Sequence, residues 1–298
     1  MATKDIPALR AQPLIPASRS FSPQQLGNES LIISRDLNSR PEIESRIITF
    51  ANEKGGVGKS TIAFHCAMAL CNAGHRVAVV DLDHRQQSMA RALENREGTA
   101  RRLKIKLPSP RSSVLNHQSS ASLIQEMARI GWDSDFIIID AAGHDSPVAR
   151  HAIAMADTLV TPVNDSFVDI DLLGQFDSIT MRLKRYGSFA RMVQELREVR
   201  DHRGQAPTDW IVVQNRMRRL GSANEQRVSD ALSELSTKAG FRLAQGLGDR
   251  VAYRELFLLG LTLFDLKHIP EFARINPAAK TEITQMIADL RLEMALAE

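Results

Sequence analysis

One glycine-rich run, KGGVGKST at residues 54–61, constrains the fold of this 298-residue chain more than any other feature. Directly before it, residues 47–51 form a short β-branched apolar stretch that is typical of a buried strand. After it the pattern becomes helical from Ser60 and ends at Asn72-Ala73-Gly74, a helix C-cap signal. A glycine loop between a strand and a helix predicts a phosphate-binding turn, because its backbone N–H groups can converge on an anion.

Further short apolar runs alternate with helical patterns along the chain. Strands are predicted at residues 77–80, 136–139, 158–163 and 210–213, each continuously apolar, like parallel strands buried on both faces. Helices are predicted around residues 88–94, 121–130, 148–156, 172–186 and 222–238. This alternation predicts an α/β fold with a doubly wound, mainly parallel sheet flanked by helices, as in P-loop NTPases.

We expect one ordered domain preceded by a tail. Residues 1–45 carry scattered Pro and Ser with mixed charge and no sustained periodicity, which predicts a disordered N-terminal tail. Residues 46–298 are predicted to form the P-loop domain, which includes a C-terminal helix. Within that domain, the prolines, serines and basic residues of 96–118 predict a surface excursion.

Composition argues against a membrane-spanning, secreted or disulfide-stabilised protein. No run approaches the roughly 20 apolar residues that cross a bilayer, and residues 1–10 lack the apolar core of a secretory signal. The only cysteines, Cys66 and Cys71, fall on one predicted helix, so we expect buried free thiols in a reducing cytoplasm. The formal charge of +3 permits contact with nucleic acid but does not argue for it.

The glycine-loop pattern predicts which of its residues bind phosphate and which binds Mg²⁺. Lys59 is expected to reach the β- and γ-phosphates of a nucleoside triphosphate, and the Ser60 hydroxyl to bind Mg²⁺. The full set of nucleotide-binding candidates in the loop is Gly55, Gly56, Val57, Gly58, Lys59, Ser60 and Thr61. The general pattern G-x-x-x-x-G-K-[ST] has a glycine where this chain has Glu53, and Lys54 stands immediately before the glycine pair.

Polar residues stand at the ends of the predicted strands. Asp81-Leu82-Asp83 follows one strand, Asp140 closes another and Asn215 follows a third. In a doubly wound sheet these carboxyl ends share the edge at which ligands bind. Hydrolysis of a nucleotide needs a carboxylate that holds the Mg²⁺ shell and a group that orients the attacking water.

The loop K-G-G-x-G-K-[ST]-T resembles that of the ParA/MinD superfamily of P-loop ATPases, which implies ATP and Mg²⁺ as cofactors. The resemblance implies that Lys54 reaches across a nucleotide-sandwich dimer to the partner's phosphates, as an arginine finger does. It implies that Asp83, rather than Asp81, positions water or the Mg²⁺ shell, and that Asp140 holds the metal through water. Lys54, Asp83 and Lys59 are thus the catalytic candidates, and Ser60, Asp83 and Asp140 the metal candidates.

Two further positions can be compared with this superfamily. Relatives usually follow the strand aspartate with Thr-Pro-Gly, whereas this chain has Ala141-Ala142-Gly143, so one hydroxyl is missing and the efficiency of hydrolysis is left open. Asn215 stands where relatives use a polar residue to read adenine, and its amide can both donate and accept; a plain turn asparagine is the alternative.

Within the superfamily, residues 47–266 are most similar to the MipZ family of division-site positioning ATPases. The matching segments are 52–56, 81–86, 161–169 and 249–263, while His84-Arg85 replaces the Asp-Pro of partitioning ParA proteins. This resemblance implies a cytoplasmic protein that dimerises on ATP, hydrolyses it slowly and sits on nucleoid DNA. It also implies recruitment by ParB and inhibition of FtsZ assembly.

Non-specific DNA binding needs clustered cations. The candidates are Arg216, Arg218 and Arg219, just after the strand at 210–213, Arg227 on the following predicted helix, and Arg250 later in the chain. Dimerisation would double such a patch and steepen its salt dependence. Solvated arginines near a loop are the alternative.

Three rival functions are weighed. A MinD-like membrane anchor needs a basic amphipathic C-terminus, but the apolar stripe of residues 283–294 is flanked mostly by acidic residues, so no membrane is expected. A metabolic enzyme needs a substrate or cluster site, for which Cys66 and Cys71 are wrongly placed. A ParA-like ATPase that positions another cargo, such as a plasmid, chromosome or protein cluster, stays open, because the partner surface carries no readable code.

Overall fold

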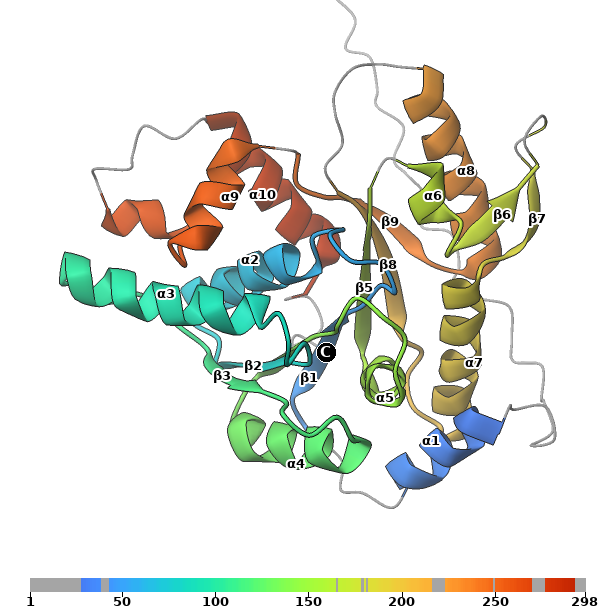
Figure 1. Ribbon diagram of the computed structural model, residues 1–298, viewed down its shortest axis with the longest axis horizontal. Helices are drawn as coiled ribbons and strands as arrows, with labels where there is room; N and C mark the ends of the chain where they lie inside the picture. Colours follow the sequence, from blue (N-terminus) through green and yellow to red (C-terminus); the bar gives the residue numbers. More distant parts are fainter. Residues whose placement is uncertain are drawn as a thin grey trace, which may run out of the picture.

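A computed structural model describes residues 28–38, 43–164, 166–177, 180, 182–215, 223–248, 250–269 and 277–292. Its centre is a seven-stranded sheet in the order β3-β2-β4-β1-β5-β8-β9 (Figure 1). The strands are β1 Arg46–Phe50, β2 Val77–Asp81, β3 Arg111–Val114, β4 Phe136–Asp140, β5 Thr158–Val163, β8 Asp209–Gln214 and β9 Arg242–Gln245. Every pairing in this sheet is parallel, so the predicted doubly wound sheet is confirmed.

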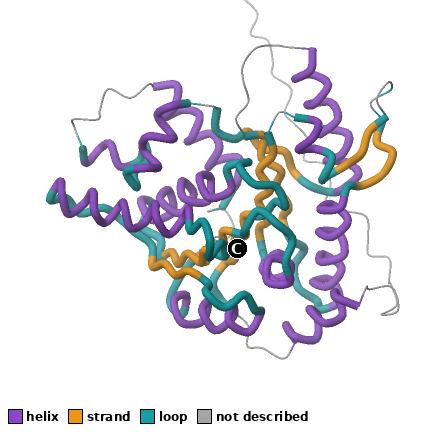
Figure 2. The backbone as a smooth tube through the Cα atoms, viewed as in Figure 1, coloured by secondary structure: helices purple, strands orange, loops and turns teal. Residues whose placement is uncertain are grey.

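Helices cover both faces of the sheet, as Figures 1 and 2 show. One core contains residues of α1 (Asn28–Asn38), α4 (Ser120–Gly131), α5 (Pro147–Met155), α7 (Ser188–His202) and α8 (Ala223–Ala239). The other contains residues of α2 (Lys59–Asn72), α3 (Ser88–Leu103), α9 (Val251–Leu258) and α10 (Pro277–Leu290). Successive strand residues point to opposite faces, so Ile137 joins the first core and Ile138 the second. This double burial explains why the strands are continuously apolar.

The register brings the predicted site residues to one edge. Phe50, the last residue of β1, lies opposite Asp140 of β4, and Asp140 lies opposite Asp81 of β2. The glycine loop leaves β1 at this edge and enters α2. Parallel pairing therefore places the loop and both strand-end carboxylates together.

The predicted tail is too long, because residues 28–38 within it form α1. Ile33 and Leu37, spaced by one helical turn, are buried against the first core, next to α7. That burial gives this short helix the tertiary support that its local sequence alone does not provide. The remaining predicted tail residues, 1–27 and 39–42, lie outside the described residues.

The helix predicted around 172–186 is also wrong. The chain there forms a hairpin of β6 (Gly174–Phe176) and β7 (Leu183–Tyr186), and the helix α7 begins only at Ser188. A Cβ at Gly187 would collide with the carbonyl of Leu172, so the chain folds back tightly at this glycine. The apolar residues that looked helical are shared between a hairpin and a turn, and tertiary contacts decided between the two periodicities.

Three elements differ from what the sequence predicted for residues 96–118 and for the edges of the sheet. Helix α3 extends through residue 103, and β3 lies inside the segment 96–118 that was predicted to be a surface excursion. Strand β9, which the sequence did not signal, adds the seventh strand at the other edge. Two short helices, α6 (Phe167–Ile170) and the 3-10 helix η2 (Asp265–His268), complete the described part. In that part, no helix combines the length and apolarity required to cross a membrane.

Candidate nucleotide site

The glycine loop has the geometry of an anion cradle. Gly56 and Gly58 have φ of 76° and 94°, in the left-handed region that glycine adopts without strain. Gly58 caps α2, and no side chain accepts from the first N–H groups of that helix. Those N–H groups, together with the positive end of the helix dipole, are available to a phosphate.

A cavity of about 360 Å³ lies against this loop. It is lined by Gly55, Gly56, Gly58, Lys59, Ser60, Thr61, Asp83, Arg85, Gln86, Ser88, Ala141, Gly143, His144 and Phe257. The structure therefore brings together the loop, the segment after β2 and the segment after β4. Phe257, which the sequence did not signal as a site residue, comes from α9 and stands edge-on to Phe64 with ring centroids 5.4 Å apart.

Asp140 is a buried carboxylate with unused hydrogen-bonding capacity. Burial, and next the nearby Asp81, raise its pKa to about 8, against the opposing effect of a hydrogen bond from the Ser60 hydroxyl and the charge of Lys59. Its Oδ1 has no hydrogen-bond partner in the described structure. A cation at this point would keep the carboxylate ionised and use the free oxygen.

This donor set fits Mg²⁺, which takes one or two protein oxygens together with phosphate and water. Ser60 supplies a hydroxyl on the cavity wall, and Asp140 hydrogen-bonds to it. Within the described ranges, no group of three or more His, Cys, Asp and Glu side chains could hold a metal ion on its own. The nucleotide's phosphates would complete the coordination, and the metal would supply charge neutralisation there.

Lys59 is a largely buried lysine whose ammonium is positioned by a backbone carbonyl of the glycine loop. It is 7% exposed, and its Nζ donates to the carbonyl of Lys54 over 2.9 Å. Burial lowers its pKa, while the charges of Asp140 and Asp83 raise it. Among the described residues this ammonium forms no ion pair, and a phosphate in the cavity would supply a direct charge partner.

The two aspartates after β2 have different environments. Asp81 accepts from the backbone N–H of Asp83 over 2.9 Å and from that of Ala90 over 3.1 Å, so it braces the start of α3. Asp83 accepts from the N–H of Gln86 over 2.9 Å and lines the cavity. The geometry therefore favours Asp83 over Asp81 as the residue that meets water or the metal shell.

Lys54 does not line the cavity, although it directly precedes Gly55, which does. Its ammonium forms an ion pair with Asp169, whose side chain is 3% exposed, while the lysine side chain is 36% exposed. Asp169 also accepts from the N–H of Asn164 over 3.3 Å. Sequence reasoning missed Asp169 as a partner of Lys54; its place in the segment 161–169, after a strand end, was the available signal.

Gly143 and Asn215 approach the loop from other segments. A Cβ on Gly143 would lie 3.1 Å from the Cα of Gly55, so only a small residue fits there. Asn215 donates to the carbonyl of Val57 over 2.8 Å and accepts from the N–H of Leu247 over 3.2 Å. Its amide thus holds the loop through the carbonyl of Val57, and Asn215 does not line the cavity.

The predicted DNA-contacting arginines are only partly placed. Arg216, Arg218 and Arg219 lie outside the described residues. Arg227 is exposed on α8. Arg250 forms an ion pair with Glu282, with 2.7 Å between Nε and Oε2, so it is already committed to an internal partner.

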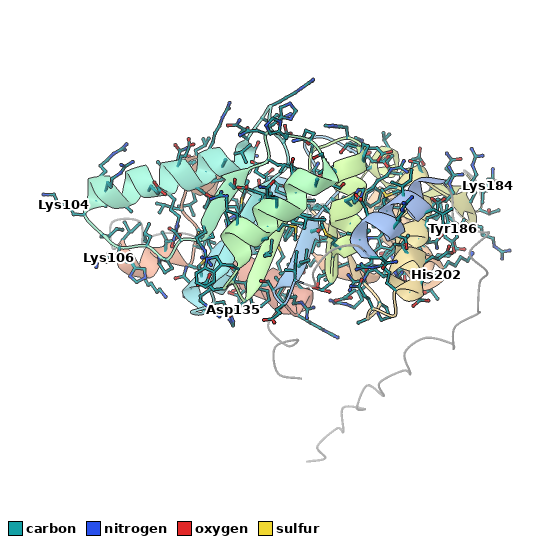
Figure 3. The ribbon with its side chains drawn as sticks, turned by 90° about the horizontal axis from the view of Figure 1, so that it is seen from below. Lys104, Lys106, Asp135, Lys184, Tyr186 and His202 are labelled. Atoms are coloured by element: carbon teal, nitrogen blue, oxygen red, sulfur yellow. The ribbon has the colours of Figure 1, made fainter. Side chains whose placement is uncertain are left out.

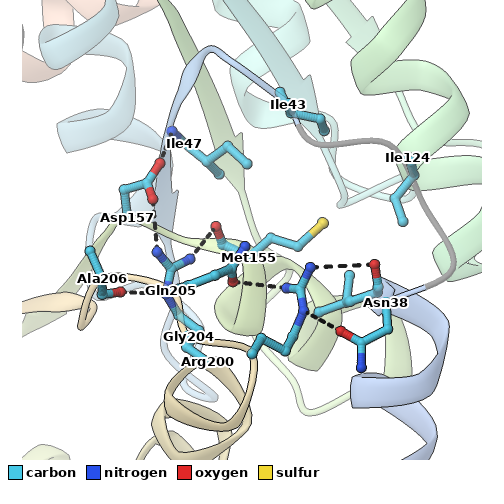
Figure 4. Close-up of a pocket in the computed structure, with 12 residues that line it drawn as sticks. Asn38, Ile43, Ile47, Ile124, Met155, Asp157, Arg200, Gly204, Gln205 and Ala206 are labelled. Atoms are coloured by element: carbon cyan, nitrogen blue, oxygen red, sulfur yellow. Dashed lines mark hydrogen bonds and ion pairs between the residues drawn. The ribbon is translucent and has the colours of Figure 1, made fainter.

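A second cavity, of about 560 Å³, lies at the opposite end of the strands, near Ile47 and Asp157 (Figure 4). Its central charge is Arg200, which donates to the carbonyls of Met155 and Ala206 and to Asp157, over 2.9 to 3.0 Å. Every nitrogen of this guanidinium has an internal acceptor. The charge of Arg200 is therefore satisfied within the fold.

Comparison with known proteins gives a consistent result. A sequence model of the family described as ATPase MipZ matches residues 46–294. The septum site-determining protein MinD of Helicobacter pylori is 29% identical over 47% of this chain and 62% of its own length. The chromosome-partitioning ATPase Soj of Thermus thermophilus is 27% identical over 42% of this chain and 57% of its own length. The chain thus spans about six-tenths of each of these relatives.

Solved structures support the fold. Apo McdA of Cyanothece superposes with a TM-score of 0.57 and 16% identity, covering 83% of this chain and 99% of that chain. MinD of Pyrococcus horikoshii in complex with Mg-ADP superposes with a TM-score of 0.54 and 16% identity, covering 85% of this chain and 99% of that chain. At these identities the likeness shows a shared P-loop NTPase fold.

Proposed function

Because the chain belongs to the ATPase MipZ family, we propose that it is an ATP-gated dimerising switch that hydrolyses ATP slowly with Mg²⁺. By resemblance to that family, its dimer would sit on nucleoid DNA in the cytoplasm, bind ParB and inhibit FtsZ assembly, and so position the division site. Its output would then be the dimer itself rather than a chemical product.

The position of Lys54 carries this proposal. A lysine that served its own nucleotide would be expected among the residues that line the cavity, as Lys59 is. Lys54 instead pairs with Asp169, neither residue lines the cavity, and about a third of the lysine side chain is exposed. From there its ammonium can exchange the carboxylate for the phosphates of a second subunit, which supports a site completed by two copies.

Each remaining residue has a proposed part in that site. Lys59 and the N–H groups from Gly55 to Thr61 bind the phosphates, and Ser60 and Asp140 hold Mg²⁺, the latter through water. Asp83, on the cavity wall, orients the attacking water. Ala141 and Ala142 offer no hydroxyl near the γ-phosphate, which is in keeping with slow hydrolysis.

Lys54→Ala tests the switch directly. We expect the variant to bind ATP within about threefold of the wild type, because the residue does not line the cavity, but to remain monomeric with ATP and Mg²⁺. Light scattering coupled to size exclusion measures the mass, and a fluorescent ATP analogue measures the affinity. Lys59→Ala is the matched control, and it is expected to lose both properties. A Lys54→Ala protein that still dimerises on ATP would contradict the proposal.

The partner is tested separately. Purified FtsZ is pelleted with and without this protein, ATP and Mg²⁺, with Lys54→Ala alongside; we expect fewer wild-type polymers and no effect of the variant. Unchanged FtsZ polymers together with retained ATP-dependent dimerisation would favour the alternative, a ParA-like ATPase that positions another cargo. The match to a chromosome-partitioning ATPase keeps that alternative in place.

A further inference from the structure

We propose that the C-terminal end of α3 and the segment after it form a surface that binds the phosphate backbone of nucleic acid. Its cations are Arg101, Arg102, Lys104 and Lys106, which we call the α3 corner. All four are exposed. The inference deepens the proposed DNA association by assigning it to a surface other than the arginines at 216–219, and it can fail while the ATP switch stands.

The α3 corner has no acidic counterpart. The sequence contains no Asp or Glu between Glu97 and Glu126. In the described structure none of the four cations forms an ion pair or a side-chain hydrogen bond. Arg111, at the start of β3, is different because it pairs with Asp133. A cluster of like charges without internal partners repels itself, and an external polyanion relieves that repulsion.

Packing fixes the direction of these side chains. In the segment 103–107 apolar and basic residues alternate, and Leu103, Ile105 and Leu107 pack against the second core. Lys104 and Lys106 therefore stand on the outer side of the same segment. Because the apolar residues point inward, this segment has nothing to insert into a lipid bilayer, which favours nucleic acid over a membrane surface.

A buried arginine holds the segment in place. Arg96 of α3 is fully buried and donates to the carbonyl of Pro108 over 2.7 and 3.0 Å. The same guanidinium binds both carboxylate oxygens of Asp265, over 2.6 and 2.8 Å. The cations are thus carried on a clamped loop, which reduces the conformational entropy lost on binding a rigid duplex.

The backbone at Lys104 gives independent support. Lys104 caps the C-terminus of α3 with φ of 55°, a left-handed conformation in which glycine is favoured and a lysine is strained. A glycine at this position would make a less strained cap than the lysine does. The positive charge of Lys104 near the C-terminus of α3 interacts favourably with the helix dipole, which offsets part of the backbone strain. Stability and binding must therefore be measured together.

The α3 corner also lies where a long polymer can reach it. Figure 3 shows Lys104 and Lys106 at one extremity of the molecule and Lys184 at the opposite one. At its other end, α3 begins with Ser88 on the wall of the nucleotide cavity. Two copies that meet at their nucleotide sites would present two such corners to one duplex.

The test uses the full chain with ATP and Mg²⁺. Binding of a short duplex of arbitrary sequence is followed by fluorescence anisotropy over a salt series, for the wild type, Lys104→Gly, and the triple variant Arg102→Gln, Lys104→Gly, Lys106→Gln. The control is Lys184→Gln with Arg185→Gln, which removes two exposed cations, of which Lys184 lies at the opposite extremity in Figure 3. Light scattering checks that each variant still dimerises on ATP.

We expect the triple variant to bind at least about 30-fold more weakly and the slope of log K against log salt to fall by about 3, since each phosphate contact contributes roughly 0.9. Lys104→Gly alone should weaken binding several-fold while leaving the melting temperature unchanged or higher. The control should bind like the wild type.

Three results would overturn the α3 corner: a triple variant that binds the duplex like the wild type, a wild-type dimer that does not bind DNA, and a wild type that binds anionic vesicles but not the duplex. In each case ATP-dependent dimerisation by light scattering would leave the proposed switch standing. Loss of that dimerisation in the wild type would instead refute the switch.

Discussion

The two ends of the parallel sheet carry cavities that differ in chemistry more than in size. At the carboxyl end, a cavity of about 360 Å³ borders a lysine without a direct acidic partner and lies over a buried carboxylate with one unpaired oxygen. At the amino end, a cavity of about 560 Å³ surrounds Arg200, whose nitrogens all donate to internal acceptors. The larger cavity is the one whose charges are already satisfied.

This difference teaches how to recognise a site in a chain of this kind. A buried charge with an internal partner has part of its desolvation cost offset, whereas one without a partner carries the whole cost and destabilises the ligand-free protein. The second arrangement persists only where something else supplies the partner. Unsatisfied polar groups beside an accessible space therefore mark the nucleotide end, and cavity volume does not.

The largest expected effect is on stability, for a substitution of Arg200 at the amino end of the sheet. Arg200→Ala leaves the carbonyls of Met155 and Ala206 unpaired and should lower the free energy of unfolding by roughly 3 kcal/mol. Affinity for ATP should not change. Urea unfolding and nucleotide titration measure the two quantities, with the half-buried Arg203→Ala as a milder control. A loss of ATP affinity without loss of stability would break the comparison.

Asp140→Asn should act in the opposite direction at the nucleotide end. Because the folded-state pKa of Asp140 is about 8, against an ordinary 3.8, the ligand-free protein loses stability as pH rises from about 4 to 8. Asparagine cannot ionise, so we expect the ligand-free variant to be more stable than the wild type at pH 7. The extra thermal stabilisation that Mg²⁺ gives with ATP should disappear. Melting curves without ligand, with ATP plus Mg²⁺ and with ATP plus EDTA measure both effects. A ligand-free variant less stable than the wild type would contradict the raised pKa of Asp140.

His65 sharpens the comparison, since its ring nitrogens are unpaired in the described structure and it lines neither of these two cavities. Both of its ring nitrogens lack partners in the described structure, and it is fully buried between Phe64 and Tyr253. Burial lowers its pKa from 6.5 to about 4. Protonation therefore favours the unfolded chain, and stability present above pH 6.5 is lost as pH falls towards 4.

The expected loss from this histidine is about 2 kcal/mol between pH 7 and 5. His65→Leu should remove that part of the pH dependence, and the exposed His117→Leu should leave the profile as it is. Urea unfolding at a series of pH values measures it. An identical profile for the His65→Leu protein would show that the ring is solvated or paired in solution.

Much of the fold could be predicted from local pattern. The strands at 47–51, 77–80, 136–139, 158–163 and 210–213 were found because burial on both faces leaves a continuous apolar run. The helix α1, the hairpin of β6 and β7, and strand β9 were missed because their support is tertiary. In α1, for example, Ile33 and Leu37 carry little information until α7 is there to cover them.

The sequence by itself determined the glycine loop, its lysine pair and the carboxylates at the strand ends, because backbone freedom and strand periodicity are local properties. Only the tertiary structure decided what those groups face. It engaged Lys54 with Asp169, gave Asp81 a bracing role and Asp83 a place on the cavity wall, and turned the amide of Asn215 towards the loop. Contacts between residues more than a hundred positions apart depend on strand order and register, which no short pattern encodes.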